Sequence, residues 1–152
     1  LSQKYGAIHL RSDAVRKHLG GISLQQKGGA ELYTPEMTER TYGELLGLAL
    51  ALLAEGQSVV LDAKYDRVNL RQQVLQTVGK LPISVRIIHP QAPVELLRER
   101  LHLRTGDIAD ATADLLAQQL QQWEPFSETE LAWVTTVDTT LEPAAWELGL
   151  SL

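Results

Sequence analysis

The feature that most constrains the fold is the regular alternation of short apolar segments with segments of helical character. Four runs have the composition of strands, namely residues 7–10, 58–63, 83–89 and 133–140. Helices are predicted over residues 12–19, 35–54, 67–79, 93–104 and 113–123, with a short one from residue 143 and the tail of another over residues 1–5. This alternation predicts an α/β fold, a doubly wound parallel sheet with helices on both faces.

Capping residues mark several of the helix ends. Ser12 is predicted to be the N-cap of one helix, and Thr34 the N-cap of another whose first residue is Pro35. Glycines are expected to end these two helices, at residues 20–21 and at Gly56. Residues 23–32 between them are polar and contain paired glycines, which predicts a loop.

Composition excludes several classes of function. With 152 residues, the chain is expected to be a single domain, residues 1–152. The net charge of −5 offers no track for an extended nucleic acid, and the absence of cysteine rules out disulfides and thiolate metal sites. The apolar run at residues 45–54 is too short to cross a bilayer, so no membrane partner and a cytoplasmic location are expected.

Charged residues follow the first and second predicted strands. Asp13 and Arg16 are three residues apart, so they share a helix face near the helix N-terminus, where open α/β sheets bind ligands. A first-turn acid also has a purely structural explanation, because it suits the helix dipole. Asp62 ends the apolar strand; it is read either as a metal ligand or as an ordinary strand-ending acid. The four histidines lack metal-ligand spacing, and the tryptophans and Met37 are expected to pack.

Three stretches in order resemble the P-loop small-molecule kinases of the AAA type, the group that includes gluconate-kinase-like, zeta-toxin-like and polynucleotide-kinase-like enzymes. They are RSDAVRKHLGG (11–21), GQSVVLDAKYDRVNLRQQV (56–74) and LLRERLHLRTGD (96–107). The tail, residues 118–140, resembles the version often fused behind an aminoglycoside-phosphotransferase-like domain. The family's phosphate-binding motif, G-x-x-x-x-G-K-S/T, occurs nowhere in residues 1–152. The resemblance places this motif and the first, central strand immediately before residue 1, so that the chain is expected to be N-terminally truncated and a fused upstream domain is possible.

The resemblance implies roles on the acceptor side of a kinase site. Asp13 is expected to be the general base that takes the proton of an acceptor hydroxyl, with Arg16 as a clamp for substrate or phosphate. Arg71, in the helix after the second strand, is expected to reach substrate, or else to be an exposed helix arginine. The loop at 23–32 is expected to help select the acceptor.

On the donor side, the resemblance implies ATP and Mg²⁺ as cofactors. Asp62 is expected to hold magnesium through water, and Arg100 and Arg104 to close over the ATP phosphates as lid arginines. Asp138 and Thr139 fall where the family's adenine-side loop runs.

The sequence therefore predicts an ATP-dependent kinase domain that phosphorylates a hydroxyl of a small molecule. A nucleotide-binding or regulatory module without turnover, and a toxin-like kinase acting on a nucleotide sugar, remain as alternatives.

Overall fold

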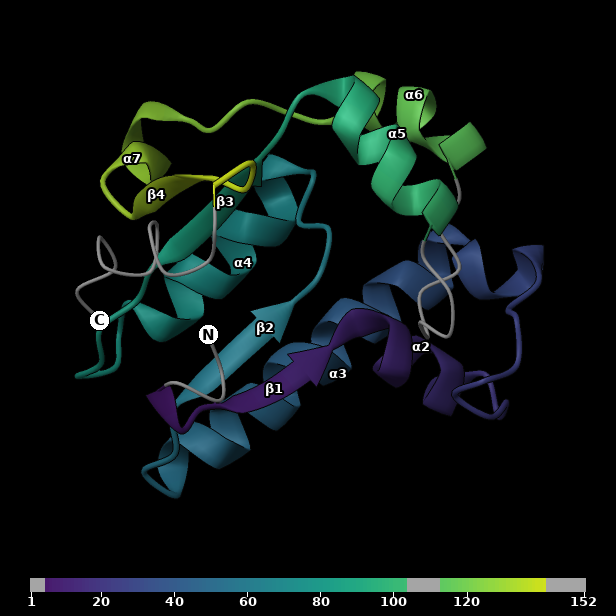
Figure 1. Ribbon diagram of the computed structural model, residues 1–152. Helices are drawn as coiled ribbons and strands as arrows, with labels where there is room; N and C mark the ends of the chain where they lie inside the picture. Colours follow the sequence, from purple (N-terminus) through teal and green to yellow (C-terminus); the bar gives the residue numbers. More distant parts are fainter. Residues whose placement is uncertain (1–4, 104–112, 142–152) are drawn as a thin grey trace. The chain divides into compact units, whose positions relative to one another are not determined.

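The computed structural model describes residues 5–103 and 113–141, which divide into two units (Figure 1). The first unit, residues 5–64, contains β1 (Ile8–Arg11), α2 (Ser12–Leu19), η1 (Ala30–Tyr33), α3 (Pro35–Ala54) and β2 (Val59–Asp62). The second unit contains α4 (Val68–Val78), β3 (Ile87–Gln91), α5 (Val94–Leu103), α6 (Ala113–Gln122), α7 (Glu128–Leu131) and β4 (Val134–Asp138). The alternation of strands and longer helices is as the sequence predicts, but the short helices η1 and α7 were not predicted, and the helix predicted from residue 143 lies outside the described residues.

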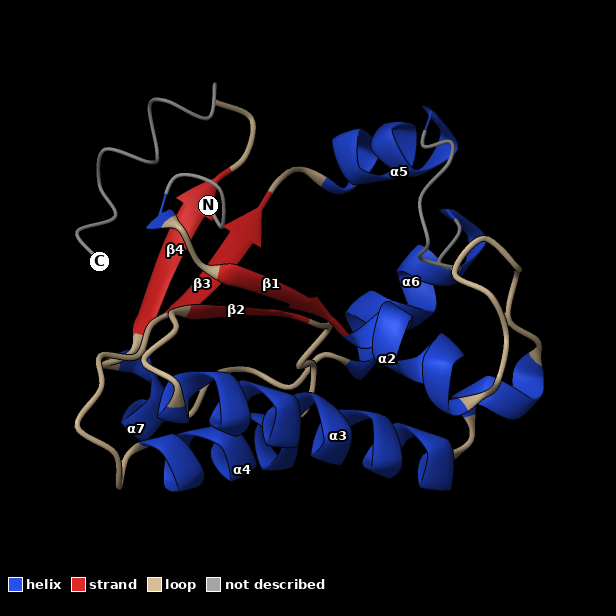
Figure 2. Ribbon diagram, turned by 90° about the horizontal axis from the view of Figure 1, so that it is seen from below, coloured by secondary structure: helices blue, strands red, loops and turns tan. Residues whose placement is uncertain are grey.

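In the first unit, α3 lies along one face of the parallel pair formed by β1 and β2 (Figure 2). The register pairs Ile8 with Val59 at one end and Arg11 with Asp62 at the other. One stripe of α3 is buried, consisting of Thr41, Tyr42, Leu45, Leu46 and Ala49. This spacing is that of an amphipathic helix, so the sequence pattern itself directs the helix onto the strands and α2.

Both helices of the first unit end in the same hydrogen-bonded motif. After α2, the Gly21 N–H donates to the His18 carbonyl and the Ile22 N–H to the Lys17 carbonyl. After α3, the Gly56 N–H donates to Leu53 and the Gln57 N–H to Leu52. Gly21 and Gly56 have φ of 69° and 75°, left-handed values that favour glycine at this position of the motif.

In the second unit, β3 and β4 form another parallel pair, with Ile87 opposite Val134 and Gln91 opposite Asp138. The predicted strand, residues 83–89, was expected to stop before Pro90; the observed strand starts later and continues through it. The Ile87 N–H donates to Trp133, the residue before β4, and the Gln91 carbonyl accepts from Thr139, the residue after β4. In this alternation the nitrogen of Pro90 faces away from β4. Its missing N–H therefore costs no hydrogen bond in the ladder with β4.

The described strands form two two-stranded sheets rather than one continuous sheet. Both pairs are parallel, as predicted. Among the four described strands, neither strand of one pair is hydrogen-bonded to a strand of the other pair. Within the described ranges, no helix combines the length and apolarity that crossing a membrane requires.

Candidate functional site

The carboxyl ends of β1 and β2 place two acids from distant parts of the sequence in one unit. Asp62 is the last residue of β2 and lies opposite Arg11, the last residue of β1. Helix α2 follows β1 without a gap, so Asp13 is in its first turn. The predicted N-cap is one residue off, because Arg11 occupies that position and Ser12 is already helical; no side-chain hydrogen bond caps the helix.

Asp62 is the centre of a small polar cluster with His9 and Arg11. Its Oδ2 lies 3.0 Å from His9 Nε2 and 3.5 Å from Arg11 Nε. His9 and Arg11 alternate along β1 and therefore project to the same face, and the register brings Asp62 to them. His9 was weighed in the sequence only as one of four histidines that lack metal-ligand spacing. The signal for this cluster is the H-x-R alternation on a strand that pairs with a strand ending in aspartate.

The residues of this cluster supply only part of what a magnesium site needs. Mg²⁺ in phosphate-transfer sites takes one or two carboxylates and several waters together with substrate phosphates. Asp62, with 53% of its side chain exposed, is one such carboxylate, but the Arg11 guanidinium and the His9 imidazole already contact its Oδ2. In the part of the chain that the structure describes, no three His, Cys, Asp or Glu residues are grouped so as to hold a metal. The described residues thus fit one water-mediated contact and no complete metal site.

Arg16 is buried and bonded to the main chain, with 7% of its surface exposed. Its Nη1 donates to the Leu32 carbonyl at 2.7 Å and to Thr38 Oγ1 at 3.4 Å. The guanidinium lies 5.0 Å from the centre of the Tyr33 ring. The predicted clamp is therefore part of the contact between α2 and the segment that precedes α3.

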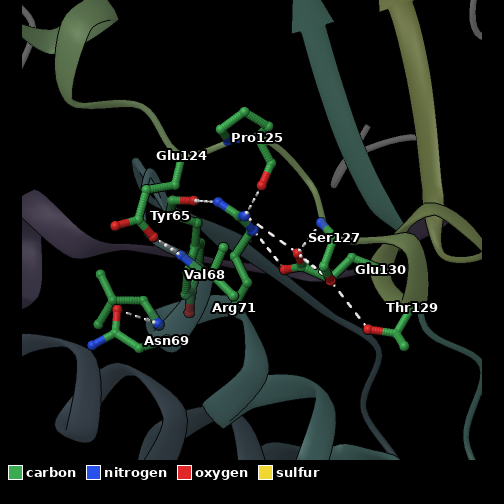
Figure 3. A network of polar contacts seen from close by, with 10 residues as sticks. Tyr65, Val68, Asn69, Arg71, Glu124, Pro125, Ser127, Thr129 and Glu130 are labelled. Carbon is green, nitrogen blue, oxygen red and sulfur yellow. Dashed lines mark hydrogen bonds and ion pairs between the residues drawn. The ribbon is translucent and has the colours of Figure 1, made fainter.

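Arg71 lies in the interior of the second unit, with 3% of its surface exposed, so the interpretation of it as an exposed helix arginine is wrong (Figure 3). Its Nε lies 2.6 Å from Glu130 Oε1, and its Nη2 3.3 Å from Glu130 Oε2. Its Nη1 also donates to the main-chain carbonyl of Tyr65, and its Nη2 to that of Pro125, each at 3.0 Å. A guanidinium whose donors are used in this way joins α4 to the segment that leads into α7 and stabilises the fold.

Glu130 was missed by the sequence analysis, although a signal for it exists. Residues 127–130 read S-E-T-E, the capping-box pattern for a helix start. The Glu130 carboxylate accepts from the Ser127 N–H at 2.7 Å and from its hydroxyl at 2.9 Å, which fixes the start of α7. Burial alone would raise the pKa of Glu130, but the hydrogen bonds from Arg71 and Ser127 hold it below its ordinary value.

An aromatic cluster lies beside Arg71. The His89 ring is stacked on Trp123, with centroids 5.4 Å apart, and Phe126 meets both rings edge-on. The Arg71 guanidinium lies 4.8 Å from the centre of the Phe126 ring. Burial, with a smaller contribution from the Arg71 charge, lowers the pKa of His89. Trp123 thus has the packing role expected from the sequence.

The structure brings together two of the residues predicted for the ATP side, Arg100 and Thr139. Arg100 donates from Nη1 to Thr139 Oγ1 at 3.0 Å and from Nη2 to the Thr139 carbonyl at 2.6 Å. Asp138 turns back on its own loop, where its Oδ1 accepts from the Thr140 hydroxyl and N–H, and these bonds lower the pKa of Asp138. Arg104 lies outside the described residues.

Parallel strand pairs with acids at their carboxyl ends, connected through helices, are the architecture of the α/β P-loop kinases. A solved structure of this class, the crystal structure of a gluconokinase from Sinorhizobium meliloti, matches the chain with a TM-score of 0.62 and 20% identity. The match covers 95% of this chain and 74% of the gluconokinase chain. The chain belongs to the AAA domain family, whose model matches residues 1–126. The family and the fold class predicted from the sequence are thereby confirmed.

The curated relatives match the chain over only part of their own length. The uncharacterized proteins Rv2004c of Mycobacterium tuberculosis and Mb2027c of Mycobacterium bovis are each 26% identical to the chain over 131 residues. The match covers 82% of this chain but 26% of each relative. The chain therefore spans about a quarter of the length of the curated relatives it matches.

Proposed function

We propose that the chain is part of an ATP-dependent kinase that phosphorylates a hydroxyl group of a small molecule. The observation that carries the proposal is the position of Asp13, in the first turn of α2 immediately after β1 ends. Open α/β sheets bind their ligands outside the carboxyl ends of the strands. In a member of a kinase-like family, a carboxylate at this place is suited to accept the proton of a bound hydroxyl.

The proposed reaction assigns one step to Asp13. Its carboxylate accepts the acceptor's hydroxyl proton as the acceptor oxygen forms a bond to the γ-phosphorus of ATP. The bond between that phosphorus and the oxygen bridging to the β-phosphate breaks, and ADP leaves with its electron pair. Phosphoryl transfer needs mainly positioning and charge stabilisation, so a correctly placed base and cations carry most of the protein's contribution.

The donor side is proposed to use Arg100 and Arg104, which would neutralise phosphate charge, with Asp138 and Thr139 near the adenine. The Arg100–Thr139 bonds support this assignment, because they join the two elements that would contact one nucleotide. Magnesium would offset phosphate charge, and Asp62 would contribute one contact to it through water.

The experiment uses the gene product that contains residues 1–152. Turnover is measured as ADP release over a panel of sugars, sugar acids, polyols and nucleotide sugars, and ATP affinity is measured by titration calorimetry. Asp13→Asn is expected to lower turnover about 100-fold or more and to leave ATP affinity unchanged, since a general base contributes roughly 10²–10⁴. The matched control is Glu36→Gln, which changes the first-turn acid of α3 and is expected to keep full turnover. Equal turnover of Asp13→Asn and wild type would contradict the assignment.

A nucleotide-binding module without turnover is the second candidate. It is favoured by Arg16, because the arginine expected to hold the transferred group or its acceptor is buried and donates to the Leu32 carbonyl. Tight ATP binding without ADP release on any acceptor of the panel would select this candidate.

A further inference from the structure

Two consecutive residues of α2 are buried cations. Arg16 is 7% exposed and Lys17 is 2% exposed. A buried cation is costly unless hydrogen bonds replace its lost water. Arg16 donates to the Leu32 carbonyl at 2.7 Å, and Lys17 Nζ donates to the Leu24 carbonyl at 3.1 Å. Both cations therefore bind the main chain of the connection between α2 and α3.

These two bonds hold the connection near its two ends. We call residues 24–33 the 24–33 segment; Lys17 binds its first residue and Arg16 its last residue but one. Leu32 is 4% exposed and packs so close to Gly20 that a Cβ there would collide with it. Thr34 then caps α3 by accepting from the Met37 N–H at 3.2 Å. The segment is thus fixed on the same helix that carries Asp13.

Arg16 also contacts Tyr33, the last residue of the segment. The Arg16 guanidinium lies 5.0 Å from the centre of the Tyr33 ring, and Tyr33 is 45% exposed. Asp13 and Arg16 are three residues apart and share a helix face. The end of the 24–33 segment is therefore bound by a residue that shares a helix face with Asp13.

We propose that Arg16 and Lys17 are positioning residues that hold the 24–33 segment as a fixed wall beside Asp13, and that Tyr33 on this wall contacts the acceptor. The inference rests on the proposed function and refines it, because Arg16 acts on the segment rather than on a phosphate. An aromatic ring beside a carboxylate suits an acceptor with an apolar ring face and adjacent hydroxyls, as a sugar has.

Hydrogen exchange on the gene product tests the positioning. Arg16→Met and Lys17→Met are expected to raise exchange in the 24–33 segment about tenfold or more while β1 and β2 keep their protection. Arg16→Lys is expected to restore part of the protection, and Lys27→Met, an exposed lysine of the same segment, to change nothing. If either methionine variant unfolds the first unit, amide exchange in the 24–33 segment is compared between Arg16→Lys and the wild type instead. Unchanged exchange in the segment would overturn the inference.

Two further measurements separate this role from anion binding and from the kinase proposal itself. Inorganic phosphate added to the wild-type protein is expected to leave the Arg16 Nε–H resonance unshifted, and a saturable shift would overturn the inference. With the best acceptor of the panel, Tyr33→Ala is expected to raise the acceptor KM about tenfold with the KM for ATP unchanged, and equal changes in both would overturn the contact. Absence of any turnover refutes the proposed function and the Tyr33 contact, whereas exchange still decides the positioning.

Discussion

The contact between Arg71 and Glu130 gives the sharpest stability prediction for this chain. Glu130→Gln keeps the shape of the side chain and removes its charge, which leaves the Arg71 guanidinium buried without its counter-ion. Removing one partner of a buried pair costs about 3–5 kcal/mol. Glutamine still has one acceptor oxygen for Arg71 or for the Ser127 donors, so we expect the lower end, about 3 kcal/mol. The measurement is the free energy of unfolding from urea denaturation, followed by tryptophan fluorescence, to which Trp123, packed against Phe126, contributes.

The pH dependence of this variant gives an independent check. Because the pKa of Glu130 in the folded state lies below its ordinary value, its contribution to stability is present above the ordinary glutamate pKa of about 4.3. The contribution is lost as the pH falls through the lower, folded-state pKa. The stability gap between wild type and Glu130→Gln is therefore expected to be complete at pH 7 and to narrow below about pH 4.

Two comparisons decide whether the reasoning holds. Glu128→Gln changes an exposed acid of the same short helix and is expected to alter stability by less than about 0.5 kcal/mol. Arg71→Met combined with Glu130→Leu removes both charges and is expected to cost less than Glu130→Gln alone. A Glu130→Gln cost no larger than that of Glu128→Gln would refute the assignment of this pair as an interior support.

Three further predictions follow from individual contacts. The pKa of His89 is lowered in the folded state, so stability should fall as the pH drops below about 6.5; His89→Gln should flatten the dependence of Tm on pH between 7 and 5, and an unchanged slope would count against this. Arg11→Gln removes a cation beside Asp62 and is expected to raise the affinity of the nucleotide-free protein for Mg²⁺ alone about threefold by calorimetry, an increase that Asp62→Asn should abolish. Arg100→Ala removes two hydrogen bonds to the turn after β4 and should raise amide exchange there about fivefold, and equal exchange would show that the bonds do not order the turn.

The sequence predicted the helices and strands well where local signals are strong. Thr34 and Pro35 mark the start of α3, and Gly56 marks its end, because capping depends only on neighbouring residues. The strand at 59–62 follows from its apolar run. The strand containing Pro90 was misjudged, since a proline is tolerated when its missing N–H faces away from the partner, and only the pairing with β4 shows that orientation.

For the candidate site, the sequence predicted the positions of the acids but not the contacts of the arginines. The sequence placed Asp13 and Asp62 after the first and second strands, and the parallel pairing of these strands confirms that both lie at their carboxyl ends. It gave no information about the contacts of the arginines. Arg71 and Glu130 are 59 positions apart, and Arg100 and Thr139 are 39 apart, so no local pattern links them.

The sequence by itself thus determined the fold class, the family and the position of the acids at the strand ends, because these depend on periodicity, capping and motif order. The tertiary structure decided which charged side chains are committed to the fold. Arg16 and Arg71 look like surface or substrate-binding arginines in the sequence, yet they are buried with main-chain carbonyls as partners. The reason is physical: any carbonyl that the fold leaves unpaired can accept from a guanidinium, and which carbonyls those are is known only once the chain has folded.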